Sequence, residues 1–205
     1  MSENNEILTI LREHNAIVYG HFLYTSGKHG EVYINKDAIY IKPKVVSELC
    51  LKMSIMVRDI DFEVVCAPTI GGVILSQWIA YHSSNLKNTE ILSVFSEEVN
   101  GKRVLKRGYD KVVENKKILV VDDILTTGSS IKKVISAVKD CKGIIQGSVC
   151  LVNRGKVNAR DIDSPFLSSL LSIDFKSYEP EECPLCKRNI PINTDLGKGK
   201  KLQNL

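Results

Sequence analysis

The sequence predicts an α/β fold in which a central, mostly parallel sheet carries helices on both faces. Short runs of consecutive apolar residues, typical of strands buried on both faces, alternate along the chain with longer segments of helical periodicity. This alternation is typical of parallel sheets, because a crossover between parallel strands usually contains a helix. The chain has 205 residues, of which 43% are hydrophobic and 25% charged, so we expect a single domain with a full core.

The individual elements follow from periodicity and from helix-start signals. Apolar residues within Ile7–Leu11 recur at helical spacing, and Pro43 suits a first helical turn. The expected helices are residues 3–14, 43–59, 73–82 and 129–141, and the expected strands are 62–67, 91–95, 117–121 and 144–152. The remaining segments are predicted to be an extended, turn-rich stretch outside the main sheet at 22–41, a mobile loop with weak β character at 96–115, and a weakly patterned tail from 163.

Composition excludes several classes of protein. The net charge of +4 is too small for a dedicated nucleic-acid binder. No apolar run approaches the roughly 20 residues that a membrane span requires, and the first six residues are polar and acidic, unlike a signal peptide. We therefore expect the six cysteines to be mainly reduced thiols in the cytoplasm, with neither a membrane nor a nucleic acid as partner.

The most informative segment is Ile118–Ser130. Asp122 and Asp123 follow four apolar residues, and a small-residue turn, Thr126–Ser130, then leads into the expected helix. Backbone N–H groups at a helix N-terminus, together with the hydroxyls of this turn and the flexible Gly128, suit a phosphate group. The two acids repel phosphate, but they can accept hydrogen bonds from ribose hydroxyls, directly or through a metal ion. An ordinary helix cap would explain one Thr or Ser, but not the acidic pair.

Two other turns are expected at the same edge of the sheet, because ligands of parallel sheets bind at the carboxyl ends of the strands. Thr69, Gly71 and Gly72 follow a predicted strand, and there the backbone can approach a second anion. Arg154 ends the last clear strand, and its guanidinium can bind a carboxylate or carbonyl through two parallel hydrogen bonds. The simpler interpretations are a plain turn for the first segment and a surface arginine for the second.

The loop at residues 100–109 carries four basic side chains flanked by glycines. Charge runs of this kind are usually solvated surface loops. The alternative is a lid that closes over a departing anionic group, where it stabilises negative charge and excludes water.

Two segments carry a family resemblance. Ile118–Ser130 resembles the phosphoribosyl-pyrophosphate (PRPP) signature of the type I phosphoribosyltransferases. Residues 20–36, with Ser26-Gly27-Lys28 and the later trio Tyr33-Ile34-Asn35, look like the hood segment of the orotate phosphoribosyltransferases. The resemblance implies a type I phosphoribosyltransferase fold with a small N-terminal hood. It divides the single domain 1–205 into a helix and hood at 1–42, an α/β core at 43–155 and a C-terminal segment at 156–205.

The resemblance also implies an activity, Mg²⁺-dependent transfer of phosphoribosyl from PRPP to orotate in pyrimidine biosynthesis, and a homodimer whose basic loop reaches the neighbouring subunit's site. The residues implied to bind PRPP are Thr69, Gly71, Gly72, Asp122, Asp123, Ile124, Leu125, Thr126, Thr127, Gly128, Ser129 and Ser130. Those implied to bind orotate are Lys28, Tyr33, Thr126 and Arg154, and those implied to be catalytic are Lys102, Arg103 and Asp123. Mg²⁺ would be held through PRPP, with Asp122 and Asp123 as its candidate protein ligands.

Two departures from the orotate pattern leave the choice of base open. Thr25 stands where the family often has a Lys, and the turn at Thr69–Gly72 has Thr69 and Ile70 where many orotate enzymes have another Lys. One alternative is therefore a phosphoribosyltransferase for a purine or for uracil. A PRPP-sensing regulator of a nucleic-acid partner ranks third, because the sequence shows no DNA-binding extension and no strong positive charge.

Cys183 and Cys186 form a single CxxC motif near the C-terminus. A zinc site needs about four ligands, and no second pair with matching spacing exists in the sequence. The histidines at positions 14, 21, 29 and 82 are all far away along the chain. A zinc ion at Cys183 and Cys186 is therefore the less favoured interpretation, and we expect it only as a half site completed across a dimer.

Overall fold

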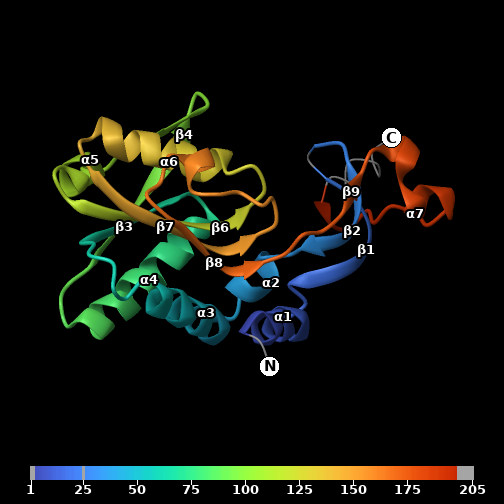
Figure 1. Cartoon of the computed structure of the whole chain (residues 1–205), viewed down its shortest axis with the longest axis horizontal. Helices are drawn as coiled ribbons and strands as arrows, with labels where there is room; N and C mark the ends of the chain where they lie inside the picture. Colours follow the sequence, from blue (N-terminus) through green and yellow to red (C-terminus); the bar gives the residue numbers. More distant parts are fainter. Residues whose placement is uncertain (1–2, 25, 198–205) are drawn as a thin grey trace. The chain divides into compact units, whose positions relative to one another are not determined.

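The computed structural model describes residues 3–24 and 26–197, which form two compact units (Figure 1). Unit 1 consists of the described residues of 1–41 and 174–205, and unit 2 of residues 42–173. The C-terminal segment expected at 156–205 is therefore divided, since residues 156–173 belong to unit 2. Thr25, one of the two departures from the orotate pattern, lies outside the described residues.

Unit 2 is built on a six-stranded sheet in which all neighbouring strands are parallel except one pair. In spatial order the strands are β5 (Lys102–Val104), β4 (Leu92–Val99), β3 (Val64–Pro68), β6 (Lys117–Leu125), β7 (Ile144–Asn153) and β8 (Leu167–Ser172). Only β5 runs antiparallel to its neighbour, β4. The expectation of a mostly parallel sheet is confirmed, and β8 is a strand that the weakly patterned tail did not reveal.

Helices cover both faces of this sheet, as the sequence predicted (Figure 1). The helices of unit 2 are α3 (Pro43–Met56), α4 (Gly71–Lys87), α5 (Tyr109–Val113), α6 (Ser129–Asp140) and the short 3₁₀ helix η1 (Arg160–Ile162). In Figure 1, α3 and α4 lie on one side of the sheet and α6 lies on the other. Helix α4 is longer than expected at both ends, since it starts with Gly71 in the turn itself and continues to Lys87.

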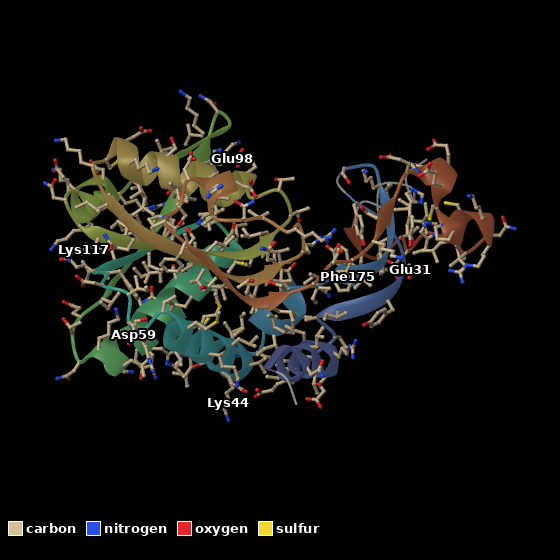
Figure 2. The ribbon with its side chains drawn as sticks, viewed as in Figure 1. Glu31, Lys44, Asp59, Glu98, Lys117 and Phe175 are labelled. Atoms are coloured by element: carbon tan, nitrogen blue, oxygen red, sulfur yellow. The ribbon has the colours of Figure 1, made fainter. Side chains whose placement is uncertain are left out.

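The core of unit 2 explains why this arrangement is stable. Four side chains at helical spacing on α6, Ile131, Val134, Ile135 and Val138, are fully buried or nearly so against the sheet. The four apolar residues of β6 from position 118 to 121 are all inaccessible to solvent, so this strand is buried on both faces. Burial of such a side chain contributes about 1.5–3 kcal/mol. Figure 2 shows the side chains that fill the space between the sheet and its helices.

Unit 1 contains a separate three-stranded antiparallel sheet. Its elements are α1 (Glu3–Glu13), β1 (Ile17–Leu23), β2 (His29–Ile34), α2 (Asp37–Tyr40), β9 (Ser177–Tyr178), the 3₁₀ helix η2 (Pro180–Glu182) and α7 (Pro184–Lys187). The helix expected at 3–14 is confirmed, and β1 and β2 confirm an extended segment outside the main sheet. The β-forming residues of Ile39–Ile41 are an exception, because they fall in and just after the helical turn α2.

The largest difference from expectation concerns residues 96–115. Instead of a mobile loop, they continue β4, turn at Asn100-Gly101, return as β5 and end in α5. The pair Val99–Lys102 closes a two-residue turn in which Asn100 and Gly101 have φ angles of +50° and +77°. Positive φ at both central residues defines the tight hairpin turn that Asn-Gly favours.

Among the described helices, none combines the length and apolar character needed to cross a bilayer.

Candidate functional site

The acidic pair lies at the carboxyl-terminal end of β6, inside the strand and not after it. Asp122 and Asp123 are each only 5% exposed. A carboxylate oxygen of Asp122 accepts a hydrogen bond from the backbone N–H of Asp123 at 2.8 Å, and one of Asp123 accepts from the N–H of Ile124 at 2.7 Å. These bonds fix one oxygen of each acid. Burial, with the two carboxylates nearby, raises the pKa of the Cys150 thiol on β7, so this thiol stays neutral beside them.

The phosphate-binding turn expected after the acids connects β6 directly to α6. Gly128 has φ +72°, a left-handed conformation that favours glycine, and it precedes the first helical residue, Ser129. A Cβ atom at Gly128 would also lie 2.7 Å from Ile162 and 2.9 Å from Val157, so a side chain does not fit there. The turn therefore presents the N-terminus of a 12-residue helix, where the helix dipole and the N–H groups that make no intrahelical bond favour an anion.

The loop after β7 packs against this turn. The backbone N–H of Arg154 donates to the carbonyl oxygen of Leu125 at 2.9 Å. A Cβ atom at Gly155 would lie 1.6 Å from the carbonyl oxygen of Thr126, so only glycine allows the two backbones to come this close. The Asn153 amide stabilises the loop by donating to the carbonyl of Val157 at 2.8 Å and accepting from its N–H at 3.1 Å. The backbone of Arg154, whose side chain is half-buried, is thus fixed beside the turn.

The turn expected to bind a second anion connects β3 to α4. Gly71 and Gly72 are buried, and a Cβ atom at Gly72 would lie 2.9 Å from both Ala67 and Pro68. The peptide bond between Thr69 and Ile70 is cis, and the N–H of Thr69 donates to the carbonyl of Ser96 on β4 at 3.1 Å.

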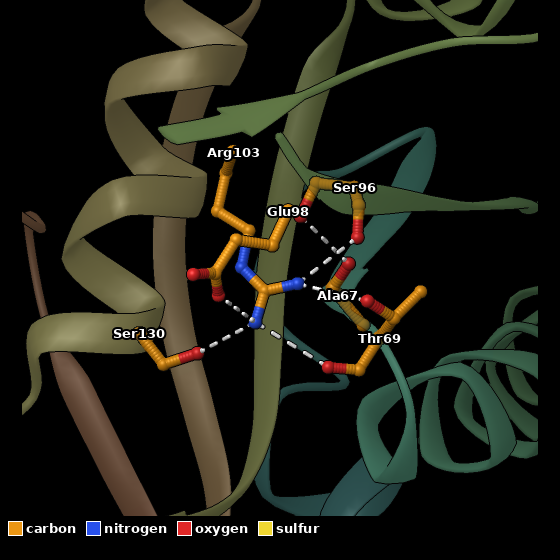
Figure 3. A network of polar contacts seen from close by, with 6 residues as sticks. All are labelled: Ala67, Thr69, Ser96, Glu98, Arg103 and Ser130. Carbon is orange, nitrogen blue, oxygen red and sulfur yellow. Dashed lines mark hydrogen bonds and ion pairs between the residues drawn. The ribbon is translucent and has the colours of Figure 1, made fainter. Parts of the chain in front are cut away.

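Arg103 on β5 joins the two turns (Figure 3). Its side chain is only 9% exposed. One terminal nitrogen donates to the Thr69 hydroxyl at 2.9 Å and to the Ser96 carbonyl at 3.3 Å. The other lies 3.4 Å from the Thr69 carbonyl, 3.5 Å from the Ser130 hydroxyl and 3.7 Å from a Glu98 carboxylate oxygen. The guanidinium therefore places a positive charge at the turn that has Thr69 and Ile70 in place of a Lys.

The other basic residues of the hairpin point elsewhere. Lys102 is exposed, as expected for the strand neighbour of an inward-pointing residue. Lys106 and Arg107 form ion pairs with Glu97 at 3.7 and 2.9 Å. Of the two candidates from the sequence, Arg103 is therefore the one that the structure brings to the turns.

Two residues expected to bind orotate belong to unit 1. Lys28 forms an ion pair with Glu179 at 2.9 Å. The Tyr33 ring packs against Phe22 with 5.4 Å between the ring centroids. Thr126 and Arg154, the other two, lie together at the turns of unit 2 described above.

The CxxC motif of unit 1 is the second group of residues that could hold a ligand. Cys183 and Cys186 lie beside His21 and His29, and the potential metal-binding atoms of the four residues are all within 4.8 Å of one another. Sequence separation hid this cluster, because the two histidines precede the cysteines by more than 150 residues.

The chain is similar in sequence to known phosphoribosyltransferases. Residues 63–177 match the phosphoribosyl transferase domain family. An orotate phosphoribosyltransferase of Thermoanaerobacter sp. (strain X514) is 36% identical over 192 residues, which cover 93% of this chain and 95% of that protein. One from Thermotoga maritima is 35% identical over 197 residues, covering 95% of this chain and all of that protein.

Solved structures give the same fold. The orotate phosphoribosyltransferase of Mycobacterium tuberculosis H37Rv superimposes with a TM-score of 0.68 at 21% identity, covering 83% of this chain and 97% of that one. This solved structure therefore has the fold class that the sequence predicted, a central, mostly parallel sheet with helices on both faces.

Proposed function

This chain belongs to the phosphoribosyl transferase family, and on that basis we propose that it transfers the phosphoribosyl group of PRPP to orotate. The products would be orotidine 5′-monophosphate and pyrophosphate. The observation that carries the proposal is the arrangement of two buried acids, a helix-opening turn directly after them, and a buried guanidinium that reaches from this turn to a second one. PRPP matches it, because phosphate groups lie at both ends of its ribose.

Each part of PRPP has a partner in this arrangement. We assign the 5′-phosphate to Thr126–Ser130, since a helix N-terminus and several hydroxyl donors meet there. The ribose hydroxyls would donate to Asp122 and Asp123. The pyrophosphate would lie along Thr69–Gly72, where the buried glycines allow close approach and Arg103 supplies charge.

Mg²⁺ fits the same site as a cofactor. The acids offer carboxylate oxygens, and Mg²⁺ prefers oxygen ligands, keeps several waters and is usually shared with substrate phosphates. Asp122 and Asp123 are the side chains that would hold it together with PRPP. When bound, the ion would neutralise part of the pyrophosphate charge.

The protein side chains would act mainly on charge that develops during bond cleavage. As the bond between C1 of ribose and the pyrophosphate oxygen breaks, the ribose gains positive character and the leaving group gains negative charge. Asp122 and Asp123 would stabilise the first charge, and Arg103 the second, without having to reorganise. Within the part of the chain that the structure describes, the buried Nε–H group of Arg103 has no hydrogen-bond acceptor, so it is a donor that the leaving group would satisfy. A ring nitrogen of orotate then bonds to C1 and loses its proton, which the departing pyrophosphate can accept.

Recognition of orotate needs a partner for its carboxylate. Arg154 is the best candidate in unit 2, because it is held at the turn beside Thr126 and its guanidinium matches a carboxylate. Lys28 and Tyr33 stay candidates from unit 1. The curated relatives named above are orotate enzymes, which favours orotate over a purine or uracil.

We extend the proposal to a cytoplasmic homodimer, as the family resemblance implies. In this structure Arg103 contacts Thr69 and Ser130 of its own chain. These contacts favour a role for Arg103 in the site of its own subunit over a role in the neighbouring subunit's site.

The assignment of Arg154 can be tested by steady-state kinetics. Arg154→Ala should raise KM for orotate by about 30-fold or more, because a buried charge pair is worth about 2–4 kcal/mol, and it should leave KM for PRPP nearly unchanged. Arg160→Ala is the matched control, since it removes the same charge from an exposed position six residues later. If Arg154→Ala weakens both substrates equally, the role of Arg154 in base recognition is wrong.

A further inference from the structure

The His–Cys cluster of unit 1 joins parts of the chain that are distant in sequence. His21 lies on β1, His29 on β2, Cys183 immediately before α7, and Cys186 within α7. His21, His29 and Cys183 are 2%, 6% and 0% exposed, and Cys186 is half-buried. Buried polar groups need partners, so the chemistry of this cluster requires an explanation.

The four binding atoms converge on one small space. Nε2 of His21 lies 2.8 Å from Nδ1 of His29 and 3.7 Å from each of the two sulfur atoms. The sulfur of Cys186 lies 3.2 Å from Nδ1 of His29. A tetrahedral zinc ion, with bonds of about 2.0–2.1 Å to nitrogen and 2.3 Å to sulfur, separates its ligand atoms by about 3.3–3.8 Å. The sulfur–nitrogen distances nearly match this range, and a small ring rotation would open the nitrogen–nitrogen distance.

Hydrogen bonding alone satisfies the cluster poorly. Nδ1 of His21 lies 2.7 Å from the carbonyl oxygen of Ile190, which can only accept, so Nδ1 carries the proton. In the neutral ring Nε2 then has a single lone pair, yet it faces three neighbours. A cation would satisfy all four groups at once. The contact to Ile190 is also the second interaction that a metal-binding histidine typically makes, because it fixes the tautomer and the ring orientation.

The donor set indicates which metal. Two thiolates and two imidazoles are the ligands of structural zinc sites, and the spacing of Cys183 and Cys186 is the one that such sites use. Two thiolates also neutralise the charge of Zn²⁺, which suits a buried position. With four protein ligands no coordination position is left for a substrate, so the site would be structural.

The surrounding structure indicates what such an ion would stabilise. The elements after residue 174 in unit 1 are only two to four residues long, and segments this short bury little apolar surface. A metal bound by β1, β2 and α7 would fasten this C-terminal segment to the hairpin.

We propose that His21, His29, Cys183 and Cys186 bind one structural zinc ion within a single chain. This replaces the half site across a dimer that the sequence alone suggested. The proposal does not depend on the transferase activity.

Metal analysis of the untagged, full-length protein tests the proposal. Protein purified without chelator should contain about one zinc per chain by plasma mass spectrometry. Cys186→Ser should reduce this content at least tenfold, because its half-buried position tolerates the change while one ligand is lost. Cys141→Ser, which alters a half-buried cysteine of unit 2, should leave it unchanged. Zinc that stays bound in Cys186→Ser would contradict the assignment.

Two measurements keep the proposal falsifiable if the variant does not fold. Co²⁺ added to metal-free wild type should give the intense visible bands of tetrahedral cobalt with thiolate ligands, and excess Zn²⁺ should abolish them. A colourless protein would overturn the proposal. Thiol titration of the denatured protein with chelator should count all six cysteines, whereas a count of four would indicate a Cys183–Cys186 disulfide and would also overturn it.

Discussion

The acidic edge of the sheet in unit 2 and the His–Cys cluster in unit 1 are assembled in opposite ways. The first is built from short contiguous segments, 69–72, 122–130 and 153–155, and much of its geometry is backbone geometry that depends on glycines. The second is built from four side chains, and its two halves are more than 150 residues apart in the sequence. The first is therefore visible as motifs, while the second becomes visible only when the chain is folded.

The two regions also differ in chemistry. At the edge of the sheet, a helix N-terminus and two acids suit a ligand that enters and leaves. In the cluster, the ligand atoms of four side chains converge on one small space and suit an ion that stays bound. Substitutions in the first region should have graded effects on activity, with Arg103→Ala the largest and Gly101→Ala the smallest.

Arg103→Ala should have the largest effect of the three. It removes the only basic side chain of the described hairpin that reaches both turns, and loss of a preorganised donor at a developing charge costs about 100-fold in rate. The loss should fall mainly on kcat, measured in steady-state assays at saturating PRPP. Lys102→Ala is the matched control and should change kcat by less than about threefold, since Lys102 is exposed. Equal losses in both variants would mean that the hairpin rearranges before catalysis.

Asp123→Asn should reduce kcat/KM for PRPP by at least about 10-fold, because a hydrogen bond to a charged group is worth about 1.5–3 kcal/mol. The asparagine keeps the size of the side chain, so the fold should persist, which circular dichroism would check. Asp59→Asn removes a similar charge at a position where the side chain is 88% exposed, and it should have no measurable effect. A folded Asp123→Asn protein with normal kinetics would rule out the ribose-binding role.

Gly101→Ala should have the smallest effect. It places a side chain at φ +77°, in open space, so only backbone strain of about 1–2 kcal/mol opposes it. That strain would destabilise the β4–β5 hairpin and so loosen Arg103, and we expect kcat to fall by less than about 10-fold while thermal stability changes little. Gly108→Ala, at φ +83° and equally open but outside β4 and β5, is the control and should leave kcat unchanged. A loss as large as that of Arg103→Ala would point to a direct role for the turn.

Sequence reasoning succeeded where a signal is local. The acidic pair ends an apolar strand, the Thr126–Ser130 and Thr69–Gly72 turns follow apolar strands, and the structure brings these two turns together through Arg103. The hairpin was missed although Asn100-Gly101 is a strong local signal, because the density of charge around it favoured a solvated loop. Without the hairpin register, the opposite directions of Lys102 and Arg103 could not be predicted.

Other features had no local signal. Strand β8 carries Ser at half of its positions, Ser168, Ser169 and Ser172, and its place at the edge of the sheet is set by pairing with β7. The meeting of His21 and His29 with Cys183 and Cys186 depends on how β9 and α7 return to the hairpin, which no spacing rule contains.

The most direct test of the account is an ultraviolet assay of the purified wild-type protein with PRPP, Mg²⁺ and one base at a time. The account predicts that orotate is consumed at a catalytic rate, that no turnover occurs without PRPP, and that adenine, guanine, hypoxanthine and uracil react at least about 100-fold more slowly, since they lack the carboxylate that Arg154 would bind. Faster turnover of a purine or of uracil would contradict the proposed substrate. No turnover of any base, by a protein that still binds PRPP, would contradict the proposed activity.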